Sequence, residues 1–288
     1  MKKSLYLIAI LALTSILFSG CKKWFDKPDT KEDLSYLIKT YEFFVSNNNT
    51  YKSIWTYDGY RATSYKYYKN GQLYSEYKNY SYDGLNASWD YYSYNNDNVN
   101  DISVRKHIEC EYLDDTYRRI KYQKTECYYP DPQDNCIYET YREYEGKKCV
   151  SYKYYMNGIL LREGYNYNYD GLHCTYKMTY YTSSNPTIVS EERSYNIVYL
   201  DDTYLRPKSS SCTIERVYED GHTYTSTDYT ITDYEGKKII GRQRFVNGNL
   251  SYVYRDYRYD GLTCYYFYDS YREGEVYSTE VYETEYLE

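Results

Sequence analysis

Apolar and polar residues alternate along most of the chain, which is the pattern of β-strands. Aromatic or apolar residues occupy every second position in stretches such as 152–156 and 165–169. A period of two residues places these side chains on one face of a strand. The sequence therefore predicts an all-β protein built from strands of about ten residues.

Short turn motifs separate these stretches. Asn-Gly and Asp-Gly tolerate positive φ at both central positions of a two-residue hairpin turn. The glycines that we expect in turns are Gly59, Gly71, Gly84, Gly146, Gly158, Gly171, Gly236, Gly248 and Gly261. Because such short connections join neighbouring strands, we expect an antiparallel up-and-down meander.

Three sequence repeats contain these motifs at fixed spacings. A tyrosine followed by Asp-Gly or Glu-Gly occurs at Tyr57, Tyr144 and Tyr234, which are 87 and 90 residues apart. An Asn-Gly pair follows 13 residues after each tyrosine, and Tyr-Asp-Gly-Leu follows after 25. The repeats span about 57–143, 144–233 and 234–288, and they predict six, six and four strands, about sixteen in total.

A sheet of this size accumulates too much twist to stay flat. Two arrangements remain open: a closed or flattened barrel, or an elongated single-layer sheet. A membrane-spanning barrel needs an uncharged outward band on every strand. The stretch 249–258 carries Arg255 on one face and Asp256 and Arg258 on the other. If residues 51–288 form a closed or flattened barrel, which is the arrangement we favour, we therefore expect it to be soluble.

The first 46 residues follow different patterns. Lys2 and Lys3 precede a run without charge from Leu5 to Phe18, which is typical of a signal peptide. We expect residues 1–20 to be removed and residues 21–30 to form a tether. Apolar residues at helical spacing between Leu34 and Val45 predict a short helix over 31–46.

The end of the signal peptide resembles a bacterial lipobox. In Phe18-Ser19-Gly20-Cys21, small residues precede a cysteine. The resemblance implies that Cys21 is diacylated and anchors the chain to a membrane. Lys22 follows the cysteine, at the position where an Asp would resemble an inner-membrane retention signal. We therefore expect the outer membrane, on its cell-surface or periplasmic side.

Composition changes the expected core and excludes one class of partner. Tyrosine supplies 51 of the 288 residues and phenylalanine only 6, so the core should be aromatic. The formal charge of -7 offers no basic footprint for a nucleic acid. Rows of tyrosine are typical of cross-strand pairs that stabilise a sheet, but an exposed row can also bind a ligand.

No motif for catalysis, a metal or a cofactor occurs in the sequence. His107, His173 and His222 lie in no triad or metal-ligand pattern, so we expect no catalytic residue, metal or cofactor. The acidic pairs at 114–115 and 201–202 could bind calcium, as could the loop 131–135. Paired acids beside a threonine are more typical of turns, which is the interpretation that we favour.

The cysteines predict one disulfide. Exported chains fold in an oxidising compartment, so some of the seven cysteines left after Cys21 should pair. Pro130 and Pro132 mark a loop between Cys127 and Cys136, which would then face each other on neighbouring strands and form a disulfide. Cys174 and Cys264 hold the place of Ala87 in the first repeat and should be small core residues.

Two groups of proteins resemble this chain. The segment Tyr67-Tyr68-Lys69-Asn70-Gly71-Gln72-Leu73 looks like the core of MORN-type hairpin repeats, which build elongated single-layer sheets for scaffolding and binding. The lipobox together with the Tyr-x-Tyr-Asp-Gly strands resembles bacterial lipoproteins with a porin-like fold. Neither resemblance implies a catalytic residue.

Three functions remain as hypotheses. The first is non-catalytic binding of a glycan or an envelope protein through a Tyr-rich β surface of a lipid-anchored envelope protein. The second is a structural or scaffold role in the outer membrane. The third, which we favour least, is a hydrolase on a β scaffold, because no acid/base pair is evident.

Overall fold

Antiparallel hairpins follow one another through the whole described part of the chain. The computed structural model describes residues 38–45, 49–59, 61–95, 98–114, 119–182, 188–202, 204, 206–218, 222–236 and 238–286. The strands are β1 (Ile38–Val45), β2 (Asn49–Asp58), β3 (Arg61–Lys69), β4 (Gln72–Asp83), β5 (Asn86–Asn95), β6 (Asn98–Tyr112), β7 (Ile120–Tyr128), β8 (Cys136–Glu145), β9 (Lys148–Met156), β10 (Ile159–Asp170), β11 (His173–Tyr181), β12 (Val189–Tyr199), β13 (Pro207–Val217), β14 (Thr223–Glu235), β15 (Lys238–Val246), β16 (Asn249–Asp260), β17 (Thr263–Arg272) and β18 (Glu275–Tyr286). One short 3-10 helix, η3 (Pro132–Asp134), lies between β7 and β8.

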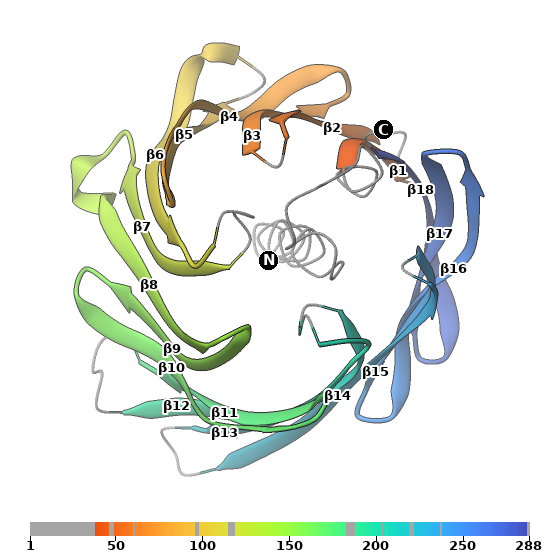
Figure 1. Ribbon diagram of the computed structural model, residues 1–288. Coiled ribbons are helices and arrows are strands. Elements are labelled where there is room, and N and C mark those ends of the chain that lie inside the picture. The colour runs from red at the N-terminus through yellow and green to blue at the C-terminus, as the bar shows by residue number, and fades with distance from the viewer. Residues whose placement is uncertain are drawn as a thin grey trace.

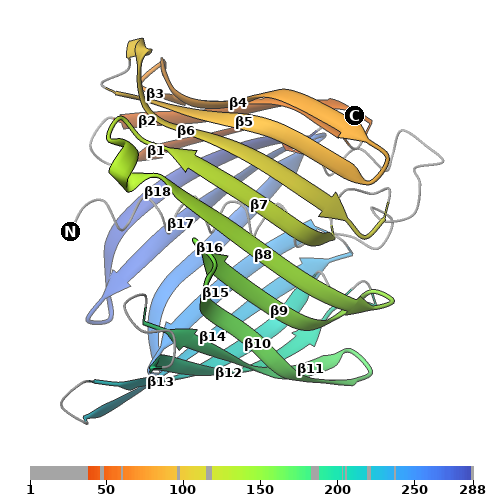
Figure 2. The same ribbon diagram turned by 90° about the vertical axis from the view of Figure 1, so that its left-hand side faces the viewer.

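The strands form one barrel (Figure 1). Each strand pairs antiparallel with the next one in sequence, and β1 pairs with both β2 and β18. The sheet therefore curves until its last strand reaches its first, and it is not the elongated single-layer sheet that was the alternative. Figure 2 shows that the strands are strongly tilted across the barrel wall. The three repeats contribute six, six and four strands, as the sequence predicts, and β1 and β2 precede them.

The helix predicted over 31–46 is wrong where the structure describes it. Residues 38–45 form β1, in register with β2 on one side and with β18 on the other. The segment Ile38-Lys-Thr-Tyr-Glu-Phe-Phe-Val45 is rich in β-branched and aromatic residues, which favour strands. Pairing on both sides also satisfies backbone groups that a helix would leave open on β2 and β18. Residues 31–37, the signal peptide, Cys21 and the tether lie outside the described residues.

Two kinds of two-residue turn recur in every repeat. In the Asn-Gly turns both central residues have positive φ, for example Asn157 at 50° and Gly158 at 78°. In the Tyr-Asp-Gly-Leu turns the register pairs Asp83 with Asn86, so the central residues are Gly84 and Leu85. Here the aspartate ends the strand and is not a central residue, and only the glycine has positive φ. All nine turn glycines named above have positive φ.

A β-bulge recurs at one position of every repeat. The pairing register shifts after Lys78 in β4, after Tyr165 in β10 and after Arg255 in β16. The residue that follows each shift has φ of 56–59°, and these residues are Asn79, Asn166 and Asp256. Asn and Asp are the non-glycine residues that best tolerate this conformation. The bulges increase the local bend of the strand, which helps the sheet to close.

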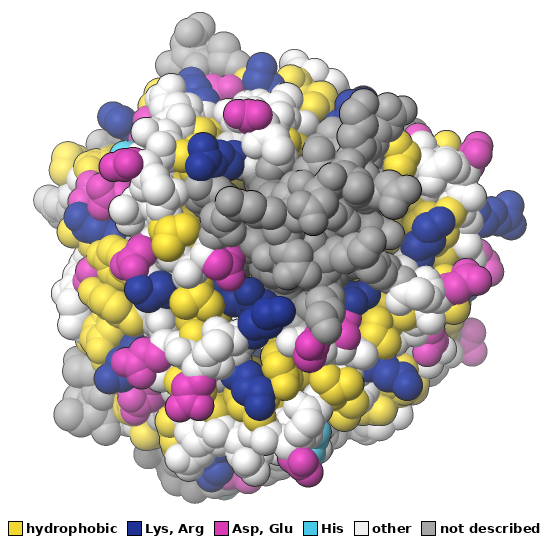
Figure 3. All heavy atoms as spheres, viewed as in Figure 1, with side chains coloured by type: hydrophobic (Ala, Val, Ile, Leu, Met, Phe, Trp, Pro, Cys, Tyr) yellow, Lys and Arg dark blue, Asp and Glu magenta, His cyan; other side chains and the backbone are white. Residues whose placement is uncertain are grey.

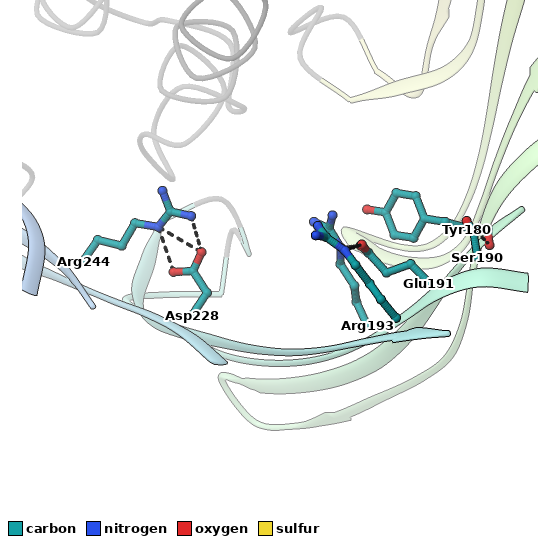
Figure 4. A network of polar contacts seen from close by, with 7 residues as sticks. Tyr180, Ser190, Glu191, Arg193, Asp228 and Arg244 are labelled. Atoms are coloured by element: carbon teal, nitrogen blue, oxygen red, sulfur yellow. Dashed lines mark hydrogen bonds and ion pairs between the residues drawn. The ribbon is translucent and has the colours of Figure 1, made fainter. Parts of the chain in front are cut away.

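The two faces of the sheet can be assigned to the inside and the outside of the barrel. Asp228 and Arg244 lie on the concave side of the wall (Figure 4). Side chains alternate between faces along a strand, and directly paired residues share a face. The pairing registers therefore extend this assignment from β14 and β15 around the circuit. We call the face that contains Asp228 the inner face and the opposite one the outer face.

Small residues fill the most buried positions of the inner face. Cys174 and Cys264 are each 1 % exposed, and Ala87, at the equivalent place in the first repeat, is 5 % exposed. They lie among tyrosine rings, which leave room only for a short side chain.

Among the described residues, no helix is long and apolar enough to cross a membrane.

Candidate binding surface: the tyrosine-lined inner face

Aromatic side chains line the inner face on most strands. They come from every repeat and follow the alternation of each strand. They include Tyr51, Trp55, Tyr65, Tyr67, Tyr77, Trp89, Tyr91, Tyr138, Tyr152, Tyr154, Tyr176, Tyr180, Tyr195, Tyr224, Tyr252, Tyr254, Tyr266, Tyr268 and Tyr282. The tyrosines that recur at every second position of the sequence therefore lie mainly on the inner face.

Some of these rings are used to hold neighbouring strands together. Tyr176 stacks between Tyr167 and Tyr195, with ring centroids 4.7 and 4.6 Å apart and interplanar angles of 6° and 7°. The third repeat has the same arrangement in Tyr257, Tyr266 and Tyr282. Burial raises the pKa of the Tyr176 phenol well above its ordinary value, so the ring stays uncharged at neutral pH. These stacks stabilise the sheet, as aromatic cross-strand pairs do.

The tyrosine of each Tyr-Asp-Gly-Leu motif also has a structural role. Its hydroxyl donates to a backbone carbonyl 20 residues earlier: Tyr82 to Ala62 at 2.8 Å, Tyr169 to Cys149 at 2.9 Å and Tyr259 to Ile239 at 2.8 Å. A basic side chain covers each ring, namely Arg61, Lys148 or Lys238. The repeated motif therefore fastens two hairpins together at this rim of the barrel.

Charged groups on the inner face form a polar network between the rings (Figure 4). Arg244 Nε donates to both carboxylate oxygens of Asp228, each at 2.9 Å. Arg193 and Arg216 both pair with Glu191. Burial acts to raise the pKa of Glu191, but the hydrogen bonds from Arg216 and Arg193 outweigh it and hold this pKa below its ordinary value. The alternation of apolar and polar residues in the sequence did not predict these ion pairs, because it does not show which face of the sheet is inner.

Ion pairs also lie on the outer face. Lys78 pairs with Glu76 at 2.6 Å and Lys124 with Glu126 at 2.6 Å. His107 Nδ1 lies 2.9 Å from Asp90 Oδ1, and the Asp90 carboxylate also accepts from Asn79. The pairing registers place each of these residues opposite in face to the inner tyrosines. The outer wall is therefore charged on many strands.

The predicted cysteine pair is brought together by the fold. Cys127 at the end of β7 lies directly opposite Cys136 at the start of β8. Both are thiols in the structure, so the disulfide stays a prediction. Cys127 is 2 % exposed, and burial raises the pKa of its thiol to about 11.

The first acid of each acidic pair bonds a buried arginine, and Asp115 lies outside the described residues. Asp114 accepts from Arg119 at 2.9 Å, and Asp201 pairs with Arg206 at the equivalent place in the second repeat. Arg119 and Arg206 are only 4 % and 5 % exposed. Asp114 and Asp201 therefore each hold a buried arginine. No group of three potential metal ligands occurs within the described residues.

Comparison with known proteins finds similar solved structures but no match among family models or curated proteins. No protein-family model matches the chain. No curated protein matches it either. One similar solved structure is a porin-like protein from Bacteroides vulgatus ATCC 8482, with 11% sequence identity and a TM-score of 0.40. The match covers 87% of this chain and 98% of that one.

Proposed function

We propose that this chain is a lipid-anchored envelope protein whose tyrosine-lined inner face binds a glycan without catalysis. The observation that carries the proposal is the unequal distribution of side chains between the two faces. Aromatic rings, hydroxyls and guanidinium groups line the inner face, and this combination suits a ligand with both apolar ring faces and hydroxyl groups.

The outer face supports the view that water surrounds the barrel. Asp269 is 2 % exposed and accepts from Arg255 Nε at 2.5 Å, while Lys124 and Glu126 form a pair on β7. A wall that faced lipid would need an apolar outer band, because charges at the bilayer midplane are costly. The charged pairs Arg255–Asp269 and Lys124–Glu126 on the outer face do not fit such a band.

The lipid anchor is part of the same proposal. The chain enters the barrel at Ile38, at the rim that also contains the Tyr-Asp-Gly-Leu turns. The Asn-Gly turns lie at the opposite rim, since strands alternate in direction. The outer membrane is the proposed location.

A glycan array tests this function. The full chain carrying Cys21→Ser, which removes the acylation site, is applied to arrays of envelope, capsular and plant oligosaccharides. Binding to one structural class of glycan is expected. If no glycan is retained, and the protein instead captures one envelope protein reproducibly, the glycan proposal is wrong and the protein partner replaces it.

A further inference from the structure

The inner face carries an excess of positive charge in an acidic protein. Among the described residues that have a direct strand partner, and leaving aside those that flank turns, seven basic side chains lie on the inner face: Lys106, Arg142, Arg162, Arg193, Arg216, Arg242 and Arg244. Three acidic side chains of this set lie there: Glu191, Asp228 and Glu280. These ten residues therefore carry a net charge of +4, whereas the whole chain has -7. Lys and Arg side chains are also visible close to the middle of one end of the barrel (Figure 3).

Much of this charge lies in one row across six strands. Directly paired residues of β9 to β14 give the order Tyr154, Arg162, Tyr180, Glu191, Arg216 and Tyr224. Arg193 lies one step away on β12, with its guanidinium 4.5 Å above the ring of Tyr180. We call these seven residues the arginine–tyrosine row. Neighbours in such a row are about 4.8 Å apart, the spacing of strands.

The basic groups of this region are only partly neutralised. Glu191 serves both Arg193 and Arg216. Arg162 stacks on Tyr154, 4.2 Å from the ring centroid, and no carboxylate in the described ranges lies within ion-pair distance of it. Arg142, one step further along the wall, has a buried Nη1 atom without a hydrogen-bond partner in the described part of the chain. Arg162 and Arg142 therefore keep positive charge that no carboxylate of the described residues neutralises.

The row lies near the Asn-Gly rim and can be reached from solvent. Arg216 is the next-to-last residue of β13, and Tyr224 is the second residue of β14. The Arg216 side chain is 46% exposed and that of Arg193 is 28% exposed, while Tyr224 is 45% exposed. The free edges of these guanidinium groups are therefore available to a ligand.

We infer that the arginine–tyrosine row binds an acidic oligosaccharide, whose sugar rings stack on the tyrosines and whose carboxylate or sulfate groups pair with the arginines. This inference rests on the proposed function and specifies the class of glycan. Guanidinium forks match carboxylate and sulfate oxygens, and charge-assisted hydrogen bonds are the stronger kind. The alternation of ring and cation along the row fits a ligand that repeats ring and anion. An acidic peptide would supply the anions but not the saccharide ring faces.

The test compares acidic and uncharged ligands by titration calorimetry on the full chain with Cys21→Ser. The probes are oligogalacturonides, heparin-derived oligosaccharides, cello-oligosaccharides of equal length and oligo-glutamate. The first two represent carboxylate and sulfate as sources of the anion. At least one of these two should bind roughly tenfold more tightly than the uncharged oligomer and the peptide, and its affinity should fall with added salt.

Variants locate the site. Arg162→Gln and Arg216→Gln should each weaken binding of the acidic oligosaccharide roughly tenfold. Lys153→Gln is the matched control, because Lys153 is exposed on the outer face of β9, between Tyr152 and Tyr154. It removes the same charge and should leave the affinity unchanged. Arg162→Lys, which keeps the charge without the fork, gives an intermediate affinity and serves if the glutamine variant does not fold.

The outcomes separate this inference from the proposed function. Equal binding of acidic and uncharged oligosaccharides, unaffected by the arginine variants, overturns the inference and leaves the glycan function standing. Tight binding of oligo-glutamate alone replaces the saccharide with an acidic peptide. Retention of no saccharide from either series overturns the inference together with the proposed function.

Discussion

Asn157 and Ile137 form two reciprocal hydrogen bonds across neighbouring hairpins. The backbone N–H of Ile137 donates to Asn157 Oδ1 at 2.8 Å, and the N–H of Asn157 donates to the Ile137 carbonyl at 2.7 Å. The same pair of bonds joins Asn70 to Thr50 and Asn247 to Thr227. The asparagine of each Asn-Gly turn therefore has two functions. It adopts positive φ, and its amide oxygen accepts a hydrogen bond from a backbone N–H of an adjacent strand.

Replacing this asparagine should lower stability through that lost bond. Asn157→Ala removes the acceptor of the Ile137 N–H and places alanine at positive φ, so we expect a loss of about 1–3 kcal/mol in the free energy of unfolding. Asn157→Asp keeps an acceptor oxygen and is the control, with a smaller loss. Urea unfolding at neutral pH measures both. An alanine variant as stable as the parent would show that the side-chain bond contributes nothing.

Two glycines of the second repeat should resist substitution for different reasons. At Gly158 an added Cβ meets no atom within 4 Å, but φ is +78°, so Gly158→Ala should cost about 1 kcal/mol. Gly164 has no positive φ and lies mid-strand, which from sequence suggests a tolerant position. In the structure, its Cβ would lie 2.6 Å from the Tyr167 hydroxyl and 3.3 Å from Tyr152 Cβ. Gly164→Ala should therefore cost about 1–3 kcal/mol through overpacking.

A double substitution distinguishes the two causes. Tyr167→Phe removes the hydroxyl that crowds position 164, so the cost of Gly164→Ala should fall when both changes are combined. The cost of Gly158→Ala should not depend on Tyr167. Thermal unfolding of the parent, the three single variants and the two double variants gives both couplings. Additive effects of the changes at 164 and 167 would contradict the close approach.

Acid should remove the stabilisation that Asp269 provides. Burial acts to raise the pKa of Asp269, but hydrogen bonds from Arg255 at 2.5 Å and Thr279 at 2.7 Å hold it below its ordinary value. A carboxyl whose pKa is lowered by folding stabilises fully above the unfolded pKa of about 3.9, and this stabilisation disappears as the pH falls through the folded pKa. Asp269→Asn should therefore be clearly less stable than the parent at neutral pH.

The difference between parent and Asp269→Asn should shrink below about pH 4. Urea midpoints over a pH series measure it. Asp233→Asn, a change of an exposed outer-face carboxyl on β14, is the matched control and should show a small, flat difference. A gap for Asp269→Asn that stays constant into acid would contradict the ion pair.

The predicted bond between Cys127 and Cys136 should appear in the exported protein. Mapping of unreduced peptides after denaturation should recover the two cysteines in one linked pair, because their backbones are in direct register. Denaturation is necessary, since the raised thiol pKa of Cys127 would slow alkylation of the folded protein even without a bond. Reduction should lower stability by about 2–3 kcal/mol. Recovery of both cysteines as separate alkylated peptides, without prior reduction, rules the bond out.

Lipidation of Cys21 makes a separate prediction. Cys21→Ser should move the protein from the membrane pellet to the soluble fraction after a high-salt wash. Cys212→Ser on β13 is the control and should stay in the pellet. A Cys21→Ser protein that still sediments with membranes would show that something other than a lipid holds it.

Sequence patterns predict the hairpins of this fold well but not its two faces. Turn motifs such as Asn157-Gly158 act locally, so strand number and order follow from their spacing. The bulges at Asn79, Asn166 and Asp256 were missed, because an asparagine within a strand carries no distinct signal. β1 was missed because its pattern also fits a helix, and only pairing with β2 and β18 decides between them.

The candidate site could be predicted only in part. The alternation of tyrosines shows which residues share a face of one strand, but not which face is inside. The arginine–tyrosine row joins residues from six strands, between Tyr154 and Tyr224, and it exists only once every register is set. The formal net charge of the chain, -7, does not predict that the residues of the inner face are mainly basic.

The most direct test of the account compares two neighbouring tyrosines on β11. Tyr180 belongs to the inner face beneath Arg193, whereas Tyr181 is on the outer face and donates to Glu163 at 2.5 Å. For the glycan retained on the array, calorimetry of Tyr180→Ala should show a roughly five- to tenfold loss of affinity, since a stacked ring contributes about 1–1.5 kcal/mol. Tyr181→Ala should bind as the parent does. Equal losses, or a loss confined to Tyr181→Ala, would contradict binding by the inner face.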